Sequence, residues 1–399
     1  MLTQRPLRGI RVLDLSRVLA GPFCAMNLAD LGAEVIKIEI PERGDDSRGY
    51  APRIPNSSDS GYFYSVNRGK QSMTLDLRMA EGADLLIEMA RHADVVLENF
   101  SPGTMKRFGL GWERLHAANP RLILCSISGF GQSGPMASAP AYDIVAQALG
   151  GTMSVTGLAG GEPTRCGVSV GDLAAALYGV VAILAALRER DLSGVGQHLD
   201  IAMLDCQVAW LEGALARYSA TGHVPGPIGS RHPSITPFQQ FRASDGYFVA
   251  GCGNEAIWQR FCDAIDRSDL KHDERFMLNA NRTDNHAQLE AILIEHFTTH
   301  PRAHWLEQLE AAKVPCAPIA RVDEVARNPQ LLAREMILKA DHPAFADLIV
   351  AGSPIKTAGT SSRPNTRAPA LGEHTDQVLT GLLGCDADRI AGLRDRKVI

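Results

Sequence analysis

The stretch RVLDLSRVLAGPFCAMNLADLGAEVIKIE, residues 11–39, decides the fold because it contains a complete strand–helix–strand unit. Its first residues are apolar, as in a buried strand, and they end in a polar turn. Gly21-Pro22 opens a helix, since proline is accepted in the first helical turn. Gly32 suits a helix C-cap, and residues 34–39 form a second strand. The stretch therefore predicts a βαβ unit, in which the two strands are parallel.

The same alternation continues along the first half of the chain. A helix is predicted over residues 80–90, strands over 94–98 and 121–127, and a long apolar helix from about 173 to 190. A further strand precedes a single long helix over residues 204–222. Strands that alternate with helices at this spacing predict an α/β fold with a Rossmann-like parallel sheet.

Two changes of composition indicate domain boundaries. Residues 222–238 are rich in Pro, Gly and Ser, as in a linker or an exposed loop, and residues 314–329 resemble a second linker. Between them lie a short strand pair and several helices. We therefore expect a discontinuous large Rossmann-like domain and a small α+β domain, with the boundaries 1–223 and 331–399 for the large domain and 224–330 for the small one.

Composition excludes several classes of partner. The 399 residues are enough for a large core, and the net charge of -5 is spread over both signs, so no basic stripe for nucleic acid is present. The uncharged run at 173–187 is shorter than the ~20 residues of a membrane span, and we expect no membrane partner. The first residues lead directly into a strand, without the pattern of a signal peptide. The eight cysteines form no C-x-x-C pair, which favours a reducing cytoplasm and no metal site.

Common nucleotide and nucleophile motifs are absent as well. The turn after the first strand lacks G-x-G-x-x-G, and Pro22 stands where a pyrophosphate turn needs glycine. The chain contains no G-x-x-x-x-G-K-[ST] and no G-x-S-x-G. We therefore expect no tightly bound cofactor.

One carboxylate stands out in GVSVGDLAAALYGVVAILAAL, residues 167–187, because Asp172 is the only charged residue in it. An N-cap carboxylate would stabilise the following helix by about 1 kcal/mol. A helix N-terminus also favours an ionised carboxylate, which is a usable nucleophile. Gly167 and Gly171 would allow a bulky substrate to approach the backbone. From these residues alone, both the capping role and the chemical role stay open.

Further segments carry a resemblance to a known family. From about residue 6 to 380 the chain resembles the family III CoA-transferases, on the stretch 11–39 and on GDDSR, NRGKQSMTLDL, ADVVLENFSPGTMKRFGL, NPRLILCSISGFGQSGP, AYDIVAQALGG, PTRCGVSVGDLAAALYG, HPSITPFQQFRASDGYF and LGEHTDQVL. The resemblance implies that Asp172 is the nucleophile and that an aspartyl-CoA thioester forms on it. It also implies that acyl-CoA is a substrate, and that two chains interlock like rings in a homodimer that shares each active site.

The resemblance further implies a CoA site on the large domain, with these matching positions: Val18, Leu19, Ala20, Leu75, Arg78, Asn99, Phe100 and Arg107. Arg78 and Arg107 also have a physical reason to bind CoA, since guanidinium groups suit phosphates. The chain departs from the formyl-CoA transferases at Ile40, where those enzymes have an arginine, so the adenine contact there must differ.

The acyl and acceptor groups are less constrained. The donor is expected to be succinyl-CoA and the acceptor a small dicarboxylate, whose second carboxylate Arg165, Arg231 or His232 could bind. Tyr142 stands where the related racemases have a catalytic histidine, which argues against racemisation. Two alternatives stay open: an acyl-CoA racemase or isomerase of the same superfamily, and a non-catalytic CoA-binding protein.

Overall fold

The computed structural model describes residues 5–357 and 364–399, and the chain divides into two compact units. The first comprises residues 1–152, 166–215 and 329–399, and the second residues 153–165 and 216–328. Residues 153–165 group with the second unit, whereas the sequence predicts them in the large domain. Within that unit the N–H of Gly229 donates to the carbonyl of Gly157 (2.9 Å), which ties the segment to the loop after residue 222.

The first unit is built on a six-stranded sheet in the order β3-β2-β1-β4-β5-β6, in which every pair is parallel. The order equals that of the doubly wound nucleotide-binding folds, and the predicted α/β class is confirmed. The strands are β1 (Arg11–Asp14), β2 (Glu34–Glu39), β3 (Gln71–Thr74), β4 (Val95–Glu98), β5 (Ile123–Ser128) and β6 (His198–Ala202).

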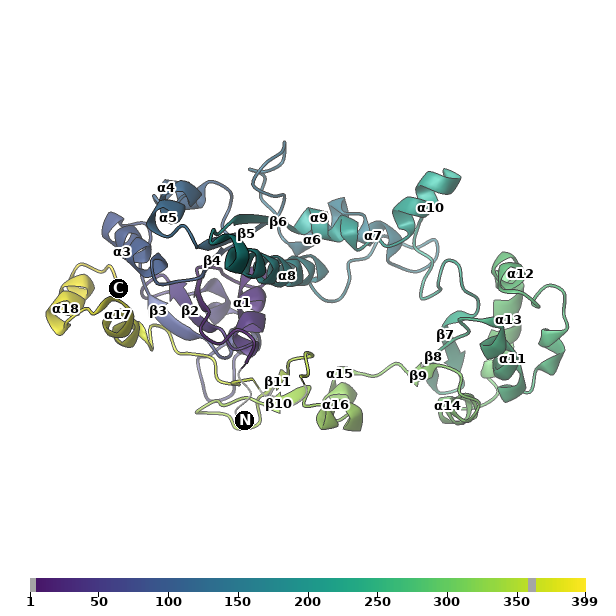
Figure 1. Cartoon of the computed structure of the whole chain (residues 1–399). Helices are drawn as coiled ribbons and strands as arrows, with labels where there is room; N and C mark the ends of the chain where they lie inside the picture. The colour runs from purple at the N-terminus through teal and green to yellow at the C-terminus, as the bar shows by residue number, and fades with distance from the viewer. Residues whose placement is uncertain (1–4, 358–363) are drawn as a thin grey trace. The chain divides into compact units, whose positions relative to one another are not determined.

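Two apolar cores cover the two faces of this sheet. Because successive side chains of a strand point to opposite faces, Leu13 joins one core and Val12 the other. The core of Leu13 contains residues of α3 (Ala80–Ala90), α17 (Thr375–Leu383) and α18 (Ala387–Asp395), whereas α1 (Ala20–Asp30) and α8 (Val170–Ser193) contribute to the core of Val12. Figure 1 shows α1 and α8 on one side of the strands and α3 and α17 on the other.

The remaining elements of the first unit lie in the connections and in the C-terminal segment. They are η1 (Asp46–Gly49), α2 (Gly61–Asn67), α4 (Thr104–Arg107), α5 (Trp112–Ala118), α6 (Asp143–Leu149), α9 (Met203–Ala209), α16 (Pro329–Ala333), β10 (Ile337–Lys339) and β11 (Ile349–Ala351). By length and composition alone α8 could cross a membrane, but half of its apolar window is buried inside the chain, as in a core helix.

The second unit has a three-stranded antiparallel sheet, β7-β8-β9, with its own aromatic core. Its elements are β7 (Phe238–Ala243), β8 (Gly246–Gly251), α11 (Glu255–Ala264), η2 (Ser268–Lys271), α12 (Asn279–Asp284), α13 (His286–Phe297), α14 (Arg302–Ala311), β9 (Cys316–Pro318) and α15 (Val322–Val325). The short helices α7 (Thr152–Val155) and α10 (Ala214–Thr221) each cross a boundary between the units.

Two sequence predictions about these connections were wrong. The single helix predicted over residues 204–222 is interrupted between α9 and α10, where Glu212 has a left-handed backbone (φ 49°) that no helix continues through. Residues 314–329 are not a plain linker, because β9 pairs with β8 there. All eight cysteines are free thiols, and the cytoplasmic location stays a prediction.

Candidate active site

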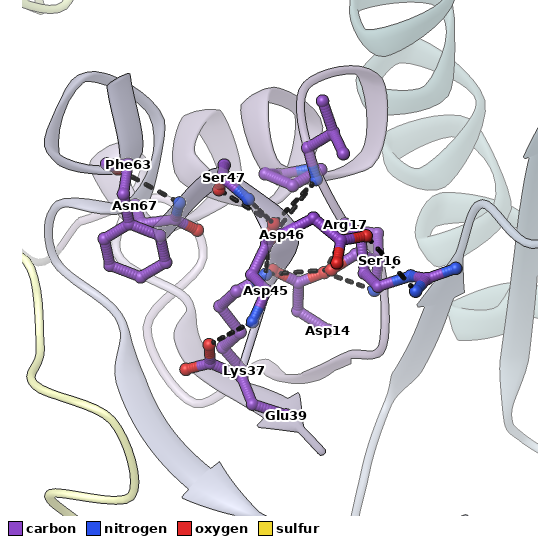
Figure 2. A network of polar contacts seen from close by, with 12 residues as sticks. Asp14, Ser16, Arg17, Lys37, Glu39, Asp45, Asp46, Ser47, Phe63 and Asn67 are labelled. Atoms are coloured by element: carbon purple, nitrogen blue, oxygen red, sulfur yellow. Dashed lines mark hydrogen bonds and ion pairs between the residues drawn. The ribbon is translucent and has the colours of Figure 1, made fainter. Parts of the chain in front are cut away.

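The turn that follows β1 is held by buried side chains. Lys37 of β2 and Asp45 form an ion pair (Nζ to Oδ2, 2.8 Å) in which both side chains are fully buried. The Lys37 ammonium donates to the carbonyl of Ser16 (2.8 Å), and the Asp45 carboxylate accepts the N–H of Val18 (3.1 and 3.2 Å). One ion pair therefore fixes the backbone on both sides of Arg17 (Figure 2).

Arg17 itself is fixed by Asn99, at the end of β4. The Asn99 amide accepts the N–H of Arg17 and donates to its carbonyl, both at 2.8 Å. In this arrangement Val18 has a left-handed backbone (φ 68°), an uncommon conformation for a β-branched residue. Such strain persists where the surroundings determine it and is concentrated at functional sites.

The electrostatics of the ion pair favour its charged form. Burial alone would raise the pKa of Asp45, but the charge of Lys37 and the hydrogen bonds from Lys37 and Ser47 outweigh burial and lower that pKa to about 2. Nearby, Lys70 is also buried and contacts Asp14 (2.8 Å). Burial lowers the pKa of Lys70 to about 8. The turn is thus anchored on charges that stay ionised at neutral pH.

A cavity of about 310 Å³ opens at the carboxyl ends of β1, β2, β3 and β4. In folds of this strand order, ligands bind at this edge of the sheet. Its walls combine apolar side chains with arginines, and they include Leu15, Arg17, Ile40, Arg43, Leu75 and Phe100. The Arg17 guanidinium lies over the Phe100 ring, 5.5 Å from its centroid.

Most of the predicted CoA positions lie in or beside this cavity. Leu75, Arg78 and Phe100 line it, while Val18, Leu19, Ala20 and Asn99 belong to the adjoining turn and to the start of α1. Arg107 lies outside the lining, but it donates to the hydroxyl of Thr104 (2.6 Å), which does line the cavity.

Three arginines border the cavity, and they differ in how closely a neighbouring carboxylate pairs with them. Arg78 makes two hydrogen bonds to the Asp76 carboxylate (2.8 and 2.6 Å). Sequence reasoning missed Arg17 and Arg43, although their place just after β1 and β2 could have indicated them. The Arg43 side chain is 78% exposed and lies 3.8 Å from Asp46, beyond hydrogen-bonding distance.

Asp172 lies in the first turn of α8, two residues after its first residue, Val170. The capping role considered from the sequence is wrong, because the N-cap is Ser169 and no side chain caps the helix from there. Instead, Asp143 of α6 accepts the N–H of Gly171 (2.8 Å), one of the free donors of the helix start. Among the described residues, no hydrogen bond or ion pair engages the Asp172 carboxyl.

The charge state of Asp172 also differs from the expected one. The sequence suggested a readily ionised carboxylate at a helix N-terminus. Burial, together with the negative charge of Asp143, instead raises the pKa of Asp172 to about 7. The phenol of Tyr62 on α2 faces the same electrostatic environment, since burial and the charge of Asp172 raise its pKa to about 12. Tyr142, at the racemase-histidine position, is 81% exposed.

The three predicted acceptor residues belong to the second unit. Arg165 is exposed, and Arg231 is half-buried with a buried Nε that has no hydrogen-bond partner within residues 5–357 and 364–399. His232 accepts the N–H of Ser234 at Nδ1 (3.1 Å) and packs against Phe238. In the described part of the chain, no group of three or more His, Cys, Asp or Glu side chains could hold a metal ion.

Comparison with known proteins identifies the family. A family model described as CoA-transferase family III matches residues 7–375. The chain belongs to CoA-transferase family III. It is 43% identical to the acetyl-CoA:oxalate CoA-transferase of Acetobacter aceti, over 92% of this chain and 93% of that one.

Two further comparisons extend this result to a dicarboxylate enzyme and to a solved structure. The chain is 39% identical to the succinate–glutarate CoA-transferase of Agrobacterium fabrum, over 94% and 96% of the two chains. A CAIB/BAIF family protein from Brucella suis superimposes with a TM-score of 0.84 at 39% identity, over 95% of this chain and 100% of that one. The chain thus has the CoA-transferase class of its relatives.

Proposed function

We propose that this CoA-transferase moves CoA from succinyl-CoA to a small dicarboxylate, through a thioester formed on Asp172. The observation that carries the proposal is the Asp172 carboxyl, which lies in the first turn of α8 without a hydrogen-bond or ion-pair partner among the described residues. A carboxylate with a structural role would normally be hydrogen-bonded or paired when it is removed from water. A nucleophile, in contrast, needs an uncommitted oxygen.

The reaction follows from the chemistry of a carboxylate and a thioester. An oxygen of Asp172 attacks the thioester carbonyl, the carbon–sulfur bond breaks, and CoA leaves as a thiolate. The thiolate attacks the Asp172 carbonyl of the resulting mixed anhydride and releases the donor acid as a carboxylate. An aspartyl-CoA thioester remains, and the acceptor carboxylate then repeats the two steps in reverse order. No proton is gained or lost, so no separate base is required.

CoA is a substrate in this proposal, and its adenosine end would occupy the cavity at the ends of β1 to β4. Apolar walls such as Leu75 and Phe100 suit a purine ring, and arginines at the rim suit phosphates. The acceptor class is supported by relatives whose names specify oxalate or succinate and glutarate.

The proposal includes an interlocked homodimer. An apolar stripe on α8, formed by Leu177, Tyr178, Val181 and Leu184, is exposed in the single chain, with Val181 exposed to 63%. An exposed apolar stripe of this kind indicates a surface that a partner chain covers. Light scattering should give a dimer of 43.0 kDa chains that persists on dilution, because threaded rings cannot part without unfolding. A monomer at micromolar concentration would rule the dimer out.

The deciding experiment is acyl exchange with covalent trapping. Purified protein is incubated with succinyl-CoA and a panel of acids, and mass spectrometry follows the new CoA thioesters. Hydroxylamine or borohydride then traps the enzyme, and the modified peptide should contain Asp172. A label on Cys166, six residues away, would disprove the aspartyl route. Inversion of a chiral acyl-CoA without any acceptor acid would favour the racemase alternative.

A further inference from the structure

Arg17 and Arg43 stand at the cavity rim, and in the described part of the chain they share one nearby carboxylate, Asp46. Both approach Asp46, Arg17 at 3.5 Å and Arg43 at 3.8 Å, so a single carboxylate faces two guanidinium groups. Arg78 differs, because Asp76 already binds its guanidinium at two points. The rim therefore offers a net positive charge at one place, and guanidinium pairs of this kind bind phosphate strongly.

Strand order indicates which phosphate this would be. In doubly wound nucleotide-binding folds, a residue near the end of the second strand binds the ribose. An acidic residue there binds a ribose hydroxyl, or an arginine binds the extra phosphate on the ribose. Here Glu39 ends β2, but its carboxylate is occupied by Arg48 (2.7 Å to each oxygen) and by Ser72 (2.6 Å). Glu39 is therefore not available to a ribose hydroxyl, whereas Arg43, four residues further along, lines the cavity.

We propose that Arg43, assisted by Arg17, binds the ribose 3′-phosphate of CoA and thereby distinguishes CoA from 3′-dephospho-CoA. This inference rests on the proposed CoA site. Arg17 is fixed for the role, since the Lys37–Asp45 ion pair holds the backbone around it (Figure 2). The Asn99 amide adds two hydrogen bonds to the Arg17 backbone. Arg43 belongs to the loop between β2 and η1 and lines the same cavity. Ile40, also in the lining, offers no charge of its own, so recognition of the phosphate falls to these two arginines.

Calorimetric titration with free CoA and with 3′-dephospho-CoA tests the inference without relying on activity. Arg43→Ala should weaken CoA binding by about tenfold to a hundredfold, which is the usual effect of removing a hydrogen bond to a charged group. Binding of 3′-dephospho-CoA should change by less than about threefold, because the group that Arg43 contacts is missing there. Arg17→Ala should act in the same direction, and Arg43→Lys should retain part of the preference for CoA.

Arg8→Ala is the matched control, because Arg8 is exposed and precedes the amino end of β1, whereas the cavity lies at the carboxyl end of that strand. It should leave both affinities unchanged. The inference is overturned if Arg43→Ala weakens the two ligands equally, or if it leaves CoA binding unchanged while the wild type still binds CoA. A wild-type protein that binds neither ligand would instead contradict the CoA site itself, so the two failures can be told apart.

Discussion

The Asp45 carboxylate accepts the backbone N–H of Val18, whose φ of 68° is strained for a β-branched residue. Because such strain costs about 1–3 kcal/mol, the turn needs a partner that holds it. The partner is a buried carboxylate that Lys37 keeps ionised. Asp45 thus acts on the cavity through the backbone of the turn.

A double-mutant cycle tests this relationship. Asp45→Asn should weaken CoA binding about tenfold in the wild-type background, because Val18 is no longer held as firmly. In a Val18→Gly background the same replacement should cost about threefold at most, since glycine adopts positive φ without strain. Calorimetry measures the four affinities, and thermal unfolding confirms that each variant is folded. Equal losses in the two backgrounds would show that Asp45 does not act through Val18.

Removal of the Asp172 carboxylate should abolish transfer but not CoA binding. Asp172→Asn keeps the size of the side chain and loses the nucleophile, so kcat should fall by at least about a thousandfold. The affinity for free CoA should change little, because the cavity at the strand ends does not include Asp172. Turnover above a few per cent of wild type would reject the nucleophile role.

Much of the fold could be predicted from the sequence, because its signals are local. The structure has β2 at Glu34–Glu39 and α3 at Ala80–Ala90, the predicted bounds, since apolar periodicity and nearby Gly or Pro mark such elements clearly. The interruption at Glu212 was not predictable in this way. Its left-handed backbone falls on a glutamate beside Gly213, and a single glycine inside a helical pattern does not by itself mark a break.

The candidate site, too, could be predicted from the sequence only in part. Asp172 was recognisable because one carboxylate interrupts a long apolar stretch. The raised pKa of Asp172 was not, because it depends on burial and on Asp143, 29 positions away in the sequence, which the fold brings close. The hydrogen bond from the Val18 N–H to Asp45 likewise joins residues that meet only once β1, β2 and the following loop are assembled.

The raised pKa of Asp172 predicts that the wild type loses stability as pH rises. Its folded-state pKa of about 7 lies above the value of about 3.9 expected in the unfolded chain. Between those values the folded state binds a proton that the unfolded state has released, so unfolding becomes easier with increasing pH. Asn cannot ionise, and the advantage of Asp172→Asn in unfolding free energy should grow by about 1–3 kcal/mol from pH 5 to pH 8.

Urea unfolding at several pH values measures this difference. Asp191→Asn serves as the control, because Asp191 is exposed near the far end of the same helix. A constant difference between Asp172→Asn and wild type across the range would contradict the raised pKa.

The raised pKa of Asp172 also predicts the acid limb of the pH–rate profile, the range in which activity falls as pH falls. Since only the ionised Asp172 is a nucleophile, kcat/KM should rise with pH and level off above an apparent pKa near 7. Asp143→Asn removes the neighbouring negative charge while retaining an oxygen for the Gly171 N–H, so the limb should move to lower pH. Stopped-flow assays between pH 5 and 9 measure both profiles. If the limb stays in place in the variant, Asp143 does not set the pKa.

The last prediction concerns the acceptor and the residues of the second unit. Arg231 has a buried Nε that lacks a partner in the described chain, and Arg231 also contributes, after burial, to the lowered pKa of His286. A buried donor without a partner costs about 1–3 kcal/mol, which a ligand carboxylate can offset. We therefore expect Arg231→Ala or Arg165→Ala to raise the KM for succinate or glutarate at least about tenfold, with the CoA affinity unchanged. Arg242→Ala, an exposed arginine on β7, is the control and should be neutral. Steady-state kinetics with a series of acids decides: faster transfer to butyrate or octanoate than to the dicarboxylates, or unchanged KM values in both variants, would overturn the assignment.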